Sequence, residues 1–385
     1  MKALTRGKIV TGSSWLEGLA LLFDERVKDF VTEEAIPSDV ERIDAGGAWI
    51  VPGFIDIHVH GGRGADAMDA EEQSLNSIAS GLAAHGVTAF CPTTMTMSPE
   101  RIEAALDAVK RVMGIPREGA TILGVHLEGP YISPGRVGAQ DGAFVERPDP
   151  EFVHRMCDIL RLVTFAPEED EGLSFLKALK EEGVVPSIGH SQATYEQAMQ
   201  AFSGGAMSVT HLFNGMPPFH HRTPGLVGAA LDADVFCELI ADGVHSHPAV
   251  FRLLHRIKGL ERVVLVSDAM RGAGLGDGEW DLGGQRVTVR GWTASLANGT
   301  IAGSVLTLDI AMKNYADAVG LPLWEAVRLV SANPAKLIGE KHRGRLGPGY
   351  FADFALLDEE WQVKRTFIGG KEVFNSNAHC NCKGL

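Results

Sequence analysis

Six histidine and carboxylate side chains stand at or near the ends of short apolar runs that are typical of β-strands: His58, His60, Glu128, His190, His211 and Asp268. Imidazole nitrogens and carboxylate oxygens suit zinc, iron, manganese or cobalt, and the lack of thiolates among them argues against a structural zinc site. A catalytic zinc usually takes three protein ligands, so this larger set suits two cations that share a carboxylate. Glu128 is the natural bridge, with one position completed by His58, His60 and Asp268 and the other by His190 and His211.

Each of these groups has an ordinary structural explanation when it is taken alone. A His-x-His pair is common, and a lone aspartate can cap a helix. Asp56, His58 and His60 share one strand face, however, and three buried polar groups there would need partners. His126 shares a face with Glu128 but lies two residues deeper, so we expect a hydrogen-bonded core histidine. The strand ends taken together favour a metal centre.

Strand-like and helix-like runs alternate through the middle of the chain, and they must position these groups. The strand-like runs are "GFIDIHVH", "VTAFCPT", "ATILGVHLE", "LVTFAPE", "VVPSIGH", "MSVTHLF", "FCELIAD" and "RVVLVSD". Amphipathic stretches such as "PERIEAALDAVKRVMG" and "PAVFRLLHRIKG" lie between several of them. The pattern predicts an α/β protein with a closed (β/α)8 barrel of the TIM type, and an open doubly wound sheet is the alternative. In a barrel the carboxyl ends of the strands gather at one mouth, where the six side chains would meet.

Both ends of the chain have a different pattern, with short alternating strands and glycine turns. "KRTFIGGKEVF" has two apolar runs around Gly369 and Gly370, which is a hairpin signal. We therefore expect a small β-sandwich domain built from residues 1–52 and 345–385, and a barrel domain over residues 53–344.

Composition restricts the partners and the compartment. The net charge of −14 over 385 residues argues against a nucleic-acid partner and against an anionic membrane surface. No apolar run approaches the roughly 20 residues of a membrane span. Five cysteines in a chain of this length indicate a reduced, cytoplasmic protein. Cys380 and Cys382 stand beside His379 in a polar tail, which we expect to be a loose tail and not a metal site.

Sequence motifs are spread over essentially the whole chain, and "HLEGP" is the most selective of them. The others include "PGFIDIHVHGG", "SIGHSQAT", "THLFNGMPP", "RTPGLVG", "IADGVHSHP", "VSDAM", "IAGSVLTL" and "GRLGPGYFADFALLD". Together they resemble the amidohydrolase superfamily, and within it the deacetylases of N-acetylated sugar phosphates. Many amidohydrolases bridge their metals with a carboxylated lysine on the fourth strand. The corresponding "LVTFAPE" has no lysine, and the resemblance gives the bridging role to Glu128.

The resemblance implies metal-dependent hydrolysis of N-acetyl-D-glucosamine 6-phosphate to D-glucosamine 6-phosphate and acetate, in amino-sugar catabolism or cell-wall recycling. It implies one or two divalent cations per subunit, zinc or iron first and manganese or cobalt as alternatives. Asp268 would be the general base and then the acid. The substrate contacts would come from Gln140, Asn214, Gly215, His245 and Arg222.

The resemblance assigns separate tasks to these contacts. Asn214 and Gly215 resemble a phosphate-contacting loop, and Arg222 an arginine that reaches the neighbouring active site of a homodimer. Gln140 stands where some relatives place a histidine near the acetyl group.

Other functions stay open on the sequence alone. The substrate could be the galactosamine epimer or another N-acyl compound, and a non-catalytic scaffold with the same fold is a further alternative. A serine hydrolase is not supported, because "GSVLTL" around Ser304 lacks the G-x-S-x-G elbow.

Overall fold

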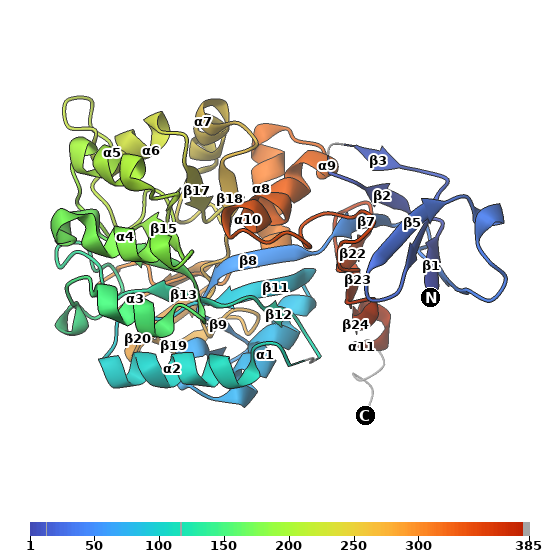
Figure 1. The fold of residues 1–385 in the computed structure, drawn as a ribbon, viewed down its shortest axis with the longest axis horizontal. Helices are drawn as coiled ribbons and strands as arrows, with labels where there is room; N and C mark the ends of the chain where they lie inside the picture. The colour runs from blue at the N-terminus through green and yellow to red at the C-terminus, as the bar shows by residue number, and fades with distance from the viewer. Residues whose placement is uncertain (13, 116–117, 380–385) are drawn as a thin grey trace.

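The computed structural model of the protein describes residues 1–12, 14–115 and 118–379. In Figure 1, strands from both ends of the chain gather at the right, and the middle of the chain forms strands with helices on their outside. The expected polar tail with Cys380 and Cys382 lies outside the described residues.

The middle of the chain contains two parallel sheets, ordered β12-β11-β8 and β13-β14-β15-β16-β17-β18. Their strands are β8 (Phe54–Val59), β11 (Val87–Pro92), β12 (Thr121–Ile122), β13 (Val125–Glu128), β14 (Leu160–Phe165), β15 (Val185–Ile188), β16 (Ser208–Val209), β17 (Phe236–Leu239) and β18 (Val263–Leu265). Nearly all of their residues are buried, as expected for parallel strands that helices cover. The strand order follows the chain order, whereas it would reverse in a doubly wound sheet. The six-stranded sheet is a parallel half-barrel.

Isolated parallel bridges connect the two sheets on both sides. Thr93 pairs with His126 on one side, and Val59 pairs with Ala269 on the other. The predicted strand over residues 120–128 is divided at Gly124, which has a φ of +125°. A Cβ atom there would lie 2.9 Å from the carbonyl oxygen of Ile159, the residue just before β14. The chain therefore changes direction at this glycine, and β12 pairs with β11 while β13 pairs with β14.

Several of the helices pack an apolar side against the parallel strands. The helices are α1 (Glu72–Ala83), α2 (Pro99–Val112), α3 (Pro150–Met156), α4 (Ser174–Glu181), α5 (Tyr195–Gly204), α6 (Gly225–Asp232), α7 (Pro248–Lys258), α8 (Leu308–Val319), α9 (Leu323–Ala326), α10 (Ala332–Leu337) and α11 (Ser376–His379). In α2 the buried Ile102, Leu106 and Val109 recur at the spacing of a single helix face. Among the described residues, no helix combines the length and the apolar character that crossing a membrane requires.

Two further sheets lie at the ends of the chain, one built from N-terminal strands alone and one from strands of both ends. One contains β1 (Lys2–Thr5), β4 (Ala20–Phe23), β5 (Val27–Val31) and β6 (Glu41–Asp44). The other contains β2 (Lys8–Val10), β3 (Trp15–Leu16), β7 (Trp49–Pro52), β22 (Phe354–Leu357), β23 (Val363–Ile368) and β24 (Lys371–Asn375). Leu4 and Phe23 of the first sheet and Ile50, Phe354 and Phe367 of the second belong to one buried apolar cluster. The hairpin predicted at the glycine pair lies between β23 and β24.

A small antiparallel sheet interrupts the middle part after β18, and the sequence analysis did not predict it. It contains β19 (Gly278–Leu282), β20 (Gln285–Arg290) and β21 (Thr293–Ser295). The signal was present, because Gly283 and Gly284 separate two alternating runs and both have positive φ. A short antiparallel pair, β9 (Gly61–Gly62) with β10 (Ala65–Asp66), follows β8.

Candidate metal centre

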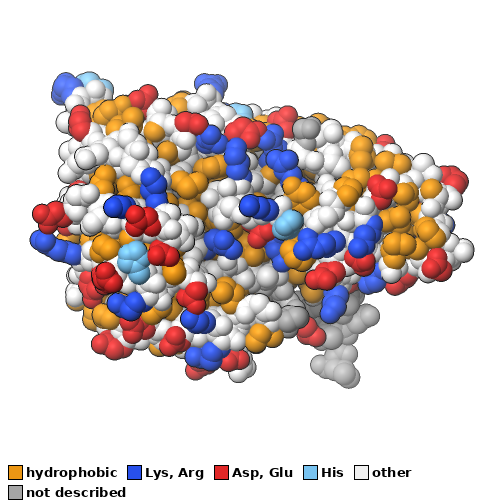
Figure 2. All heavy atoms as spheres, in the orientation of Figure 1, with side chains coloured by type: hydrophobic (Ala, Val, Ile, Leu, Met, Phe, Trp, Pro, Cys, Tyr) orange, Lys and Arg blue, Asp and Glu red, His pale blue; other side chains and the backbone are white. Residues whose placement is uncertain are grey.

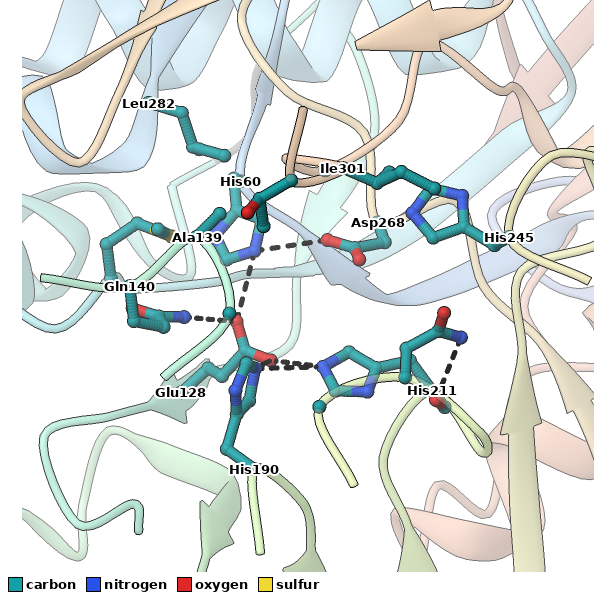
Figure 3. Close-up of a pocket in the computed structure, with 16 residues that line it drawn as sticks. His60, Glu128, Ala139, Gln140, His190, His211, His245, Asp268, Leu282 and Ile301 are labelled. Atoms are coloured by element: carbon teal, nitrogen blue, oxygen red, sulfur yellow. Dashed lines mark hydrogen bonds and ion pairs between the residues drawn. The ribbon is translucent and has the colours of Figure 1, made fainter. Parts of the chain in front are cut away.

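The parallel strands bring the six predicted metal ligands together. His58 lies in β8 with His60 just beyond it, and Glu128 is the last residue of β13. The other three, His190, His211 and Asp268, follow the ends of β15, β16 and β18. All six are buried. Figure 3 shows five of them directed into one cavity.

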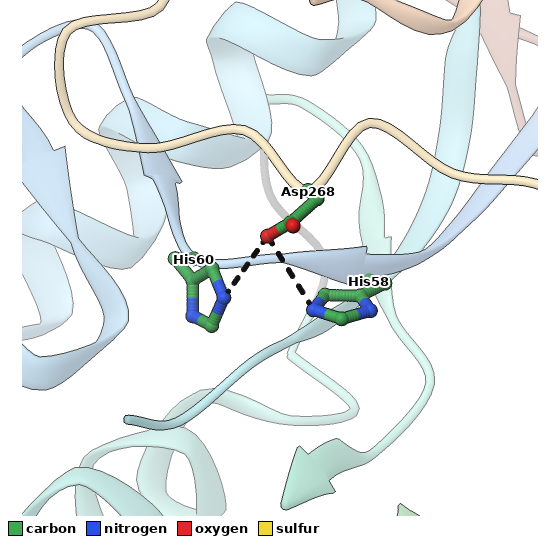
Figure 4. A group of neighbouring side chains, drawn as sticks. All are labelled: His58, His60 and Asp268. Atoms are coloured by element: carbon green, nitrogen blue, oxygen red, sulfur yellow. Dashed lines mark ion pairs between the residues drawn. The ribbon is translucent and has the colours of Figure 1, made fainter. Parts of the chain in front are cut away.

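His58, His60 and Asp268 form one compact group of candidate ligands, drawn in Figure 4. The Asp268 Oδ1 atom lies 3.2 Å from His60 Nε2 and 3.5 Å from His58 Nε2. One candidate ligand atom from each residue lies within 4.8 Å of those of the other two. This spacing leaves room for one cation between three donor atoms.

Glu128, His190 and His211 form the second group. Glu128 Oε1 lies 2.9 Å from His211 Nε2 and 3.3 Å from His190 Nε2. The other oxygen of the same carboxylate, Oε2, lies 3.2 Å from His60 Nε2. Glu128 therefore contacts both groups, which is the geometry expected of a bridging carboxylate.

The charges of the two groups stabilise one another. Burial opposes the charged form of His60, but Asp268 and Glu128 raise its pKa to about 9. Burial also opposes ionisation of Asp268, but the charges of His58 and His60 lower its pKa to about 2. The pKa of Glu128 lies well below its usual value despite burial, because His58, His190 and His211 surround it. Two ionised carboxylates are thus buried among imidazoles, where a cation would also neutralise them.

The buried imidazole nitrogens fit a divalent cation. His58 Nε2 has no hydrogen-bond partner among the described residues. His60 and His190 use Nδ1 to contact the backbone carbonyl oxygens of Thr93 and Arg136, at 3.2 and 2.8 Å. A carbonyl oxygen can only accept, so each Nδ1 carries a proton, and in the neutral form of each ring Nε2 has a lone pair for a metal.

Three candidate ligands have backbone conformations that are rare for residues with a side chain. The φ angles of His190, His211 and Asp268 are +46°, +29° and +48°. Such conformations are strained, and they persist where the surrounding structure holds them. They direct each side chain into the cavity from the turn that follows its strand.

A cavity of about 250 Å³ opens above the two groups. Four of the predicted substrate contacts line it: Gln140, Asn214, Gly215 and His245. His245 contacts Asp242 at 2.6 Å through its Nδ1 atom. Gln140 donates from Nε2 to Glu128 at 3.0 Å, so its amide already holds the bridging carboxylate. The cavity therefore combines the candidate metal ligands with uncharged polar groups.

Arg222 does not line this cavity within its own chain. It lies in the exposed loop 218–223 before α6, and its guanidinium contacts His221 at 3.1 Å. This loop projects from the molecule in Figure 1 and carries basic side chains in Figure 2. The prediction that Arg222 reaches a neighbouring active site therefore stays a prediction.

His126 is the hydrogen-bonded core histidine that the sequence suggested. Its Nε2 lies 2.7 Å from Thr164 Oγ1, and its Nδ1 lies 3.1 Å from the Ile57 carbonyl oxygen. Burial and the charge of nearby His58 hold its pKa well below the usual value, so it is neutral.

The sequence analysis missed several residues around the centre. Leu282, Thr300 and Ile301 line the cavity from the small antiparallel sheet and the loop after it. Glu238 in β17 lies beneath the metal ligands and contacts His58 Nδ1 at 3.1 Å. A charged residue inside the apolar run "VFCELIA" was the available signal for Glu238, because a buried carboxylate needs a partner.

The chain is similar to known proteins over most of its length. A model of the amidohydrolase family matches residues 49–373. An N-acetylglucosamine-6-phosphate deacetylase of Lysinibacillus sphaericus is 38% identical over 343 residues, which cover 88% of this chain and 89% of the relative. The crystal structure of an N-acetylglucosamine-6-phosphate deacetylase from Pasteurella multocida has a TM-score of 0.91 at 30% identity, covering 96% and 99% of the two chains.

A further similar structure contains a substrate. It is an alanine variant of the N-acetyl-D-glucosamine-6-phosphate deacetylase from Mycobacterium smegmatis in complex with N-acetyl-D-glucosamine-6-phosphate. It matches this chain with a TM-score of 0.90 at 34% identity, covering 97% of this chain and 99% of the other.

Proposed function

The chain belongs to the amidohydrolase family, and we propose that it is the enzyme that hydrolyses N-acetyl-D-glucosamine 6-phosphate to D-glucosamine 6-phosphate and acetate. One observation of the chain itself carries the proposal. Glu128 contacts both groups of candidate ligands at the base of a cavity of small-molecule size.

The buried donor set suits the divalent metal that amidohydrolases use. When bound, such a cation supplies an acidified water and polarises the acetyl carbonyl group. One metal position would be formed by His58, His60 and Asp268, and a second metal position by His190 and His211. Glu128 would be shared by the two positions. We infer one or two cations per subunit, zinc or iron before manganese or cobalt, because imidazole and carboxylate ligands suit all four.

Asp268 is the proposed general base and acid. Its carboxylate is ionised at neutral pH, because the charges of His58 and His60 outweigh the cost of its burial. It accepts a proton from the attacking water as the oxygen of that water bonds to the acetyl carbon. The same proton then passes to the nitrogen as the C–N bond breaks, so that the products are acetate and a free amine.

The remaining contacts would orient the sugar phosphate. Asn214 and Gly215 line the cavity in the loop after β16, where backbone N–H groups can face an anion. Arg222 of a second subunit would pair with the phosphate in a homodimer, since a guanidinium suits bidentate phosphate binding. His245 would contact the sugar and Gln140 the acetyl group, beside the carboxylate that Gln140 holds.

The architecture that we infer follows the same family. The bridges at Thr93 and Val59 would close the two parallel sheets into a (β/α)8 barrel over residues 53–344. The two terminal sheets with their shared apolar cluster would form a small β-sandwich domain from residues 1–52 and 345–385. Cys91, Cys157 and Cys237 are free thiols, which supports a cytoplasmic location.

Turnover of the two epimeric substrates tests the proposal. Purified protein should release acetate from N-acetylglucosamine 6-phosphate much faster than from N-acetylgalactosamine 6-phosphate. Equal or faster release from the galacto epimer would overturn the substrate assignment, and release from neither would overturn the deacetylase function.

A further inference from the structure

Glu238 is a buried carboxylate that belongs to neither group of candidate ligands. It lies in β17 and is 0% exposed. Its Oε2 atom lies 3.1 Å from His58 Nδ1 and 3.4 Å from the backbone N–H of His211. Its Oε1 atom has no hydrogen-bond partner among the described residues. One carboxylate oxygen of Glu238 therefore contacts both a candidate ligand in β8, His58, and a candidate ligand just after β16, His211.

The hydrogen bond to Glu238 determines which nitrogen of His58 carries the proton. A carboxylate only accepts, so His58 Nδ1 must donate. In the neutral imidazole, Nε2 then keeps a lone pair. That atom lies 3.5 Å from Glu128 Oε1 and 3.5 Å from Asp268 Oδ1. Two carboxylate oxygens facing Nε2 favour positive charge there: a proton in the metal-free protein, where Glu128 and Asp268 raise the pKa of His58 despite burial, or a bound cation that takes the place of this proton.

Glu238 differs from the acceptors that hold the other histidines. His60 and His190 donate to neutral backbone carbonyl groups, and His211 Nδ1 has no partner among the described residues. A neutral acceptor would be enough to fix a tautomer. A charged acceptor also makes the imidazole a stronger metal ligand. Both His58 Nε2 and His60 Nε2 face Glu128 and Asp268, at 3.5 and 3.2 Å, but of these two histidines only His58 donates to a carboxylate.

We propose that Glu238 is a positioning residue that holds His58 with its proton on Nδ1 and directs Nε2 to the cation shared with His60 and Asp268. Glu238 acts through His58 and does not contact the cation or the substrate. The inference rests on the proposed function only in requiring that the centre binds a divalent cation.

Zinc affinity tests the proposal without any assay of activity. Wild-type protein, Glu238→Ala and Glu238→Gln are stripped with a chelator and then titrated with Zn²⁺ against a chromogenic competitor. We expect Glu238→Ala to bind Zn²⁺ about 10–100-fold more weakly. Glu238→Gln should lose less, because its amide oxygen can still accept from His58 Nδ1.

Asp353→Asn is the matched control. Asp353 is also buried, and it pairs with Arg343 and accepts from the Gly369 N–H in the terminal sheet, away from the metal centre. This variant should lower the melting temperature and leave the zinc affinity unchanged. If Glu238 had only a structural role, its variants would behave in the same way, and that result would overturn the proposal.

A measurement on wild-type protein covers the case in which Glu238→Ala does not fold. Nitrogen-15 spectra of the histidine side chains in the zinc-loaded protein should show His58 with a proton on Nδ1, with the signal assigned through Glu238→Gln. A proton on Nε2 would overturn the proposal. Wild-type protein that takes up no Zn²⁺ would overturn the proposed function as well, whereas equal affinity in wild type and both variants would overturn only the role of Glu238.

Discussion

Among single residues, the Asp268 carboxylate is the group on which the proposed reaction should depend most. Replacing it in Asp268→Asn removes the group that accepts and returns the proton. We expect the rate of acetate release to fall by about 10²–10⁴-fold, while the protein stays folded. Asp170→Asn is a suitable control, because Asp170 is also buried but accepts from the backbone N–H groups of Phe175 and Leu176. Near-normal activity in Asp268→Asn would refute the base assignment.

The raised pKa of His60 predicts how the stability of the metal-free protein depends on pH. Asp268 and Glu128 raise its pKa from 6.5 to about 9 despite burial, so the folded chain holds a proton that the unfolded chain releases. This contribution to the free energy of unfolding is fully present below pH 6.5 and is lost as the pH rises through about 9. Melting temperatures of chelated protein should therefore fall over this range. His60→Asn should show a smaller decrease, since the raised pKa values of His58 and His190 still contribute, and an identical decrease in the variant would contradict the assignment.

Among the structural elements, the turn after β16 holds a glycine that lies close to the candidate ligand His190. Gly215 has a φ of +63°, and a Cβ atom there would lie 3.0 Å from His190 Nδ1. Gly215→Ala should therefore displace His190 from Glu128 and lower both zinc content and acetate release.

Gly183→Ala is a control variant that introduces the same kind of backbone strain without a new contact to His190. Gly183 has a φ of +71° with open space around its Cβ position. Both variants should lose stability, because alanine is disfavoured at positive φ. Only Gly215→Ala should lose activity, and equal activity in the two would show that the contact with His190 does not matter.

The sequence predicted the elements that carry the metal ligands, because apolar runs that end in histidine or a carboxylate are visible without a structure. It did not predict the sheet over residues 278–295, since short antiparallel strands give a weak signal beside long buried ones. It also missed Glu238, because only the three-dimensional contact with His58 shows why a carboxylate belongs in that strand. The break at Gly124 depends on how closely the neighbouring strand approaches, which a linear pattern does not contain.

For the whole molecule, the proposal that Arg222 reaches a neighbouring subunit predicts active sites shared between subunits. Arg222→Ala and Asp268→Asn should each be nearly inactive. When the two variants are refolded together, half of the dimers are mixed, and each contains one site with both an intact Arg222 and an intact Asp268. Acetate release should recover to about a quarter of the wild-type value in a two-fold symmetric dimer. No recovery from dimers shown to be mixed would contradict the shared site.

We propose that side chains far apart in the sequence hold divalent cations that the hydrolysis requires. The most direct test measures metal content per chain together with acetate release from N-acetylglucosamine 6-phosphate, before chelation, after it and after metal is restored. We predict one or two cations per chain, loss of activity when they are removed and recovery when zinc or iron is returned. Full acetate release from protein that contains no metal would contradict the account.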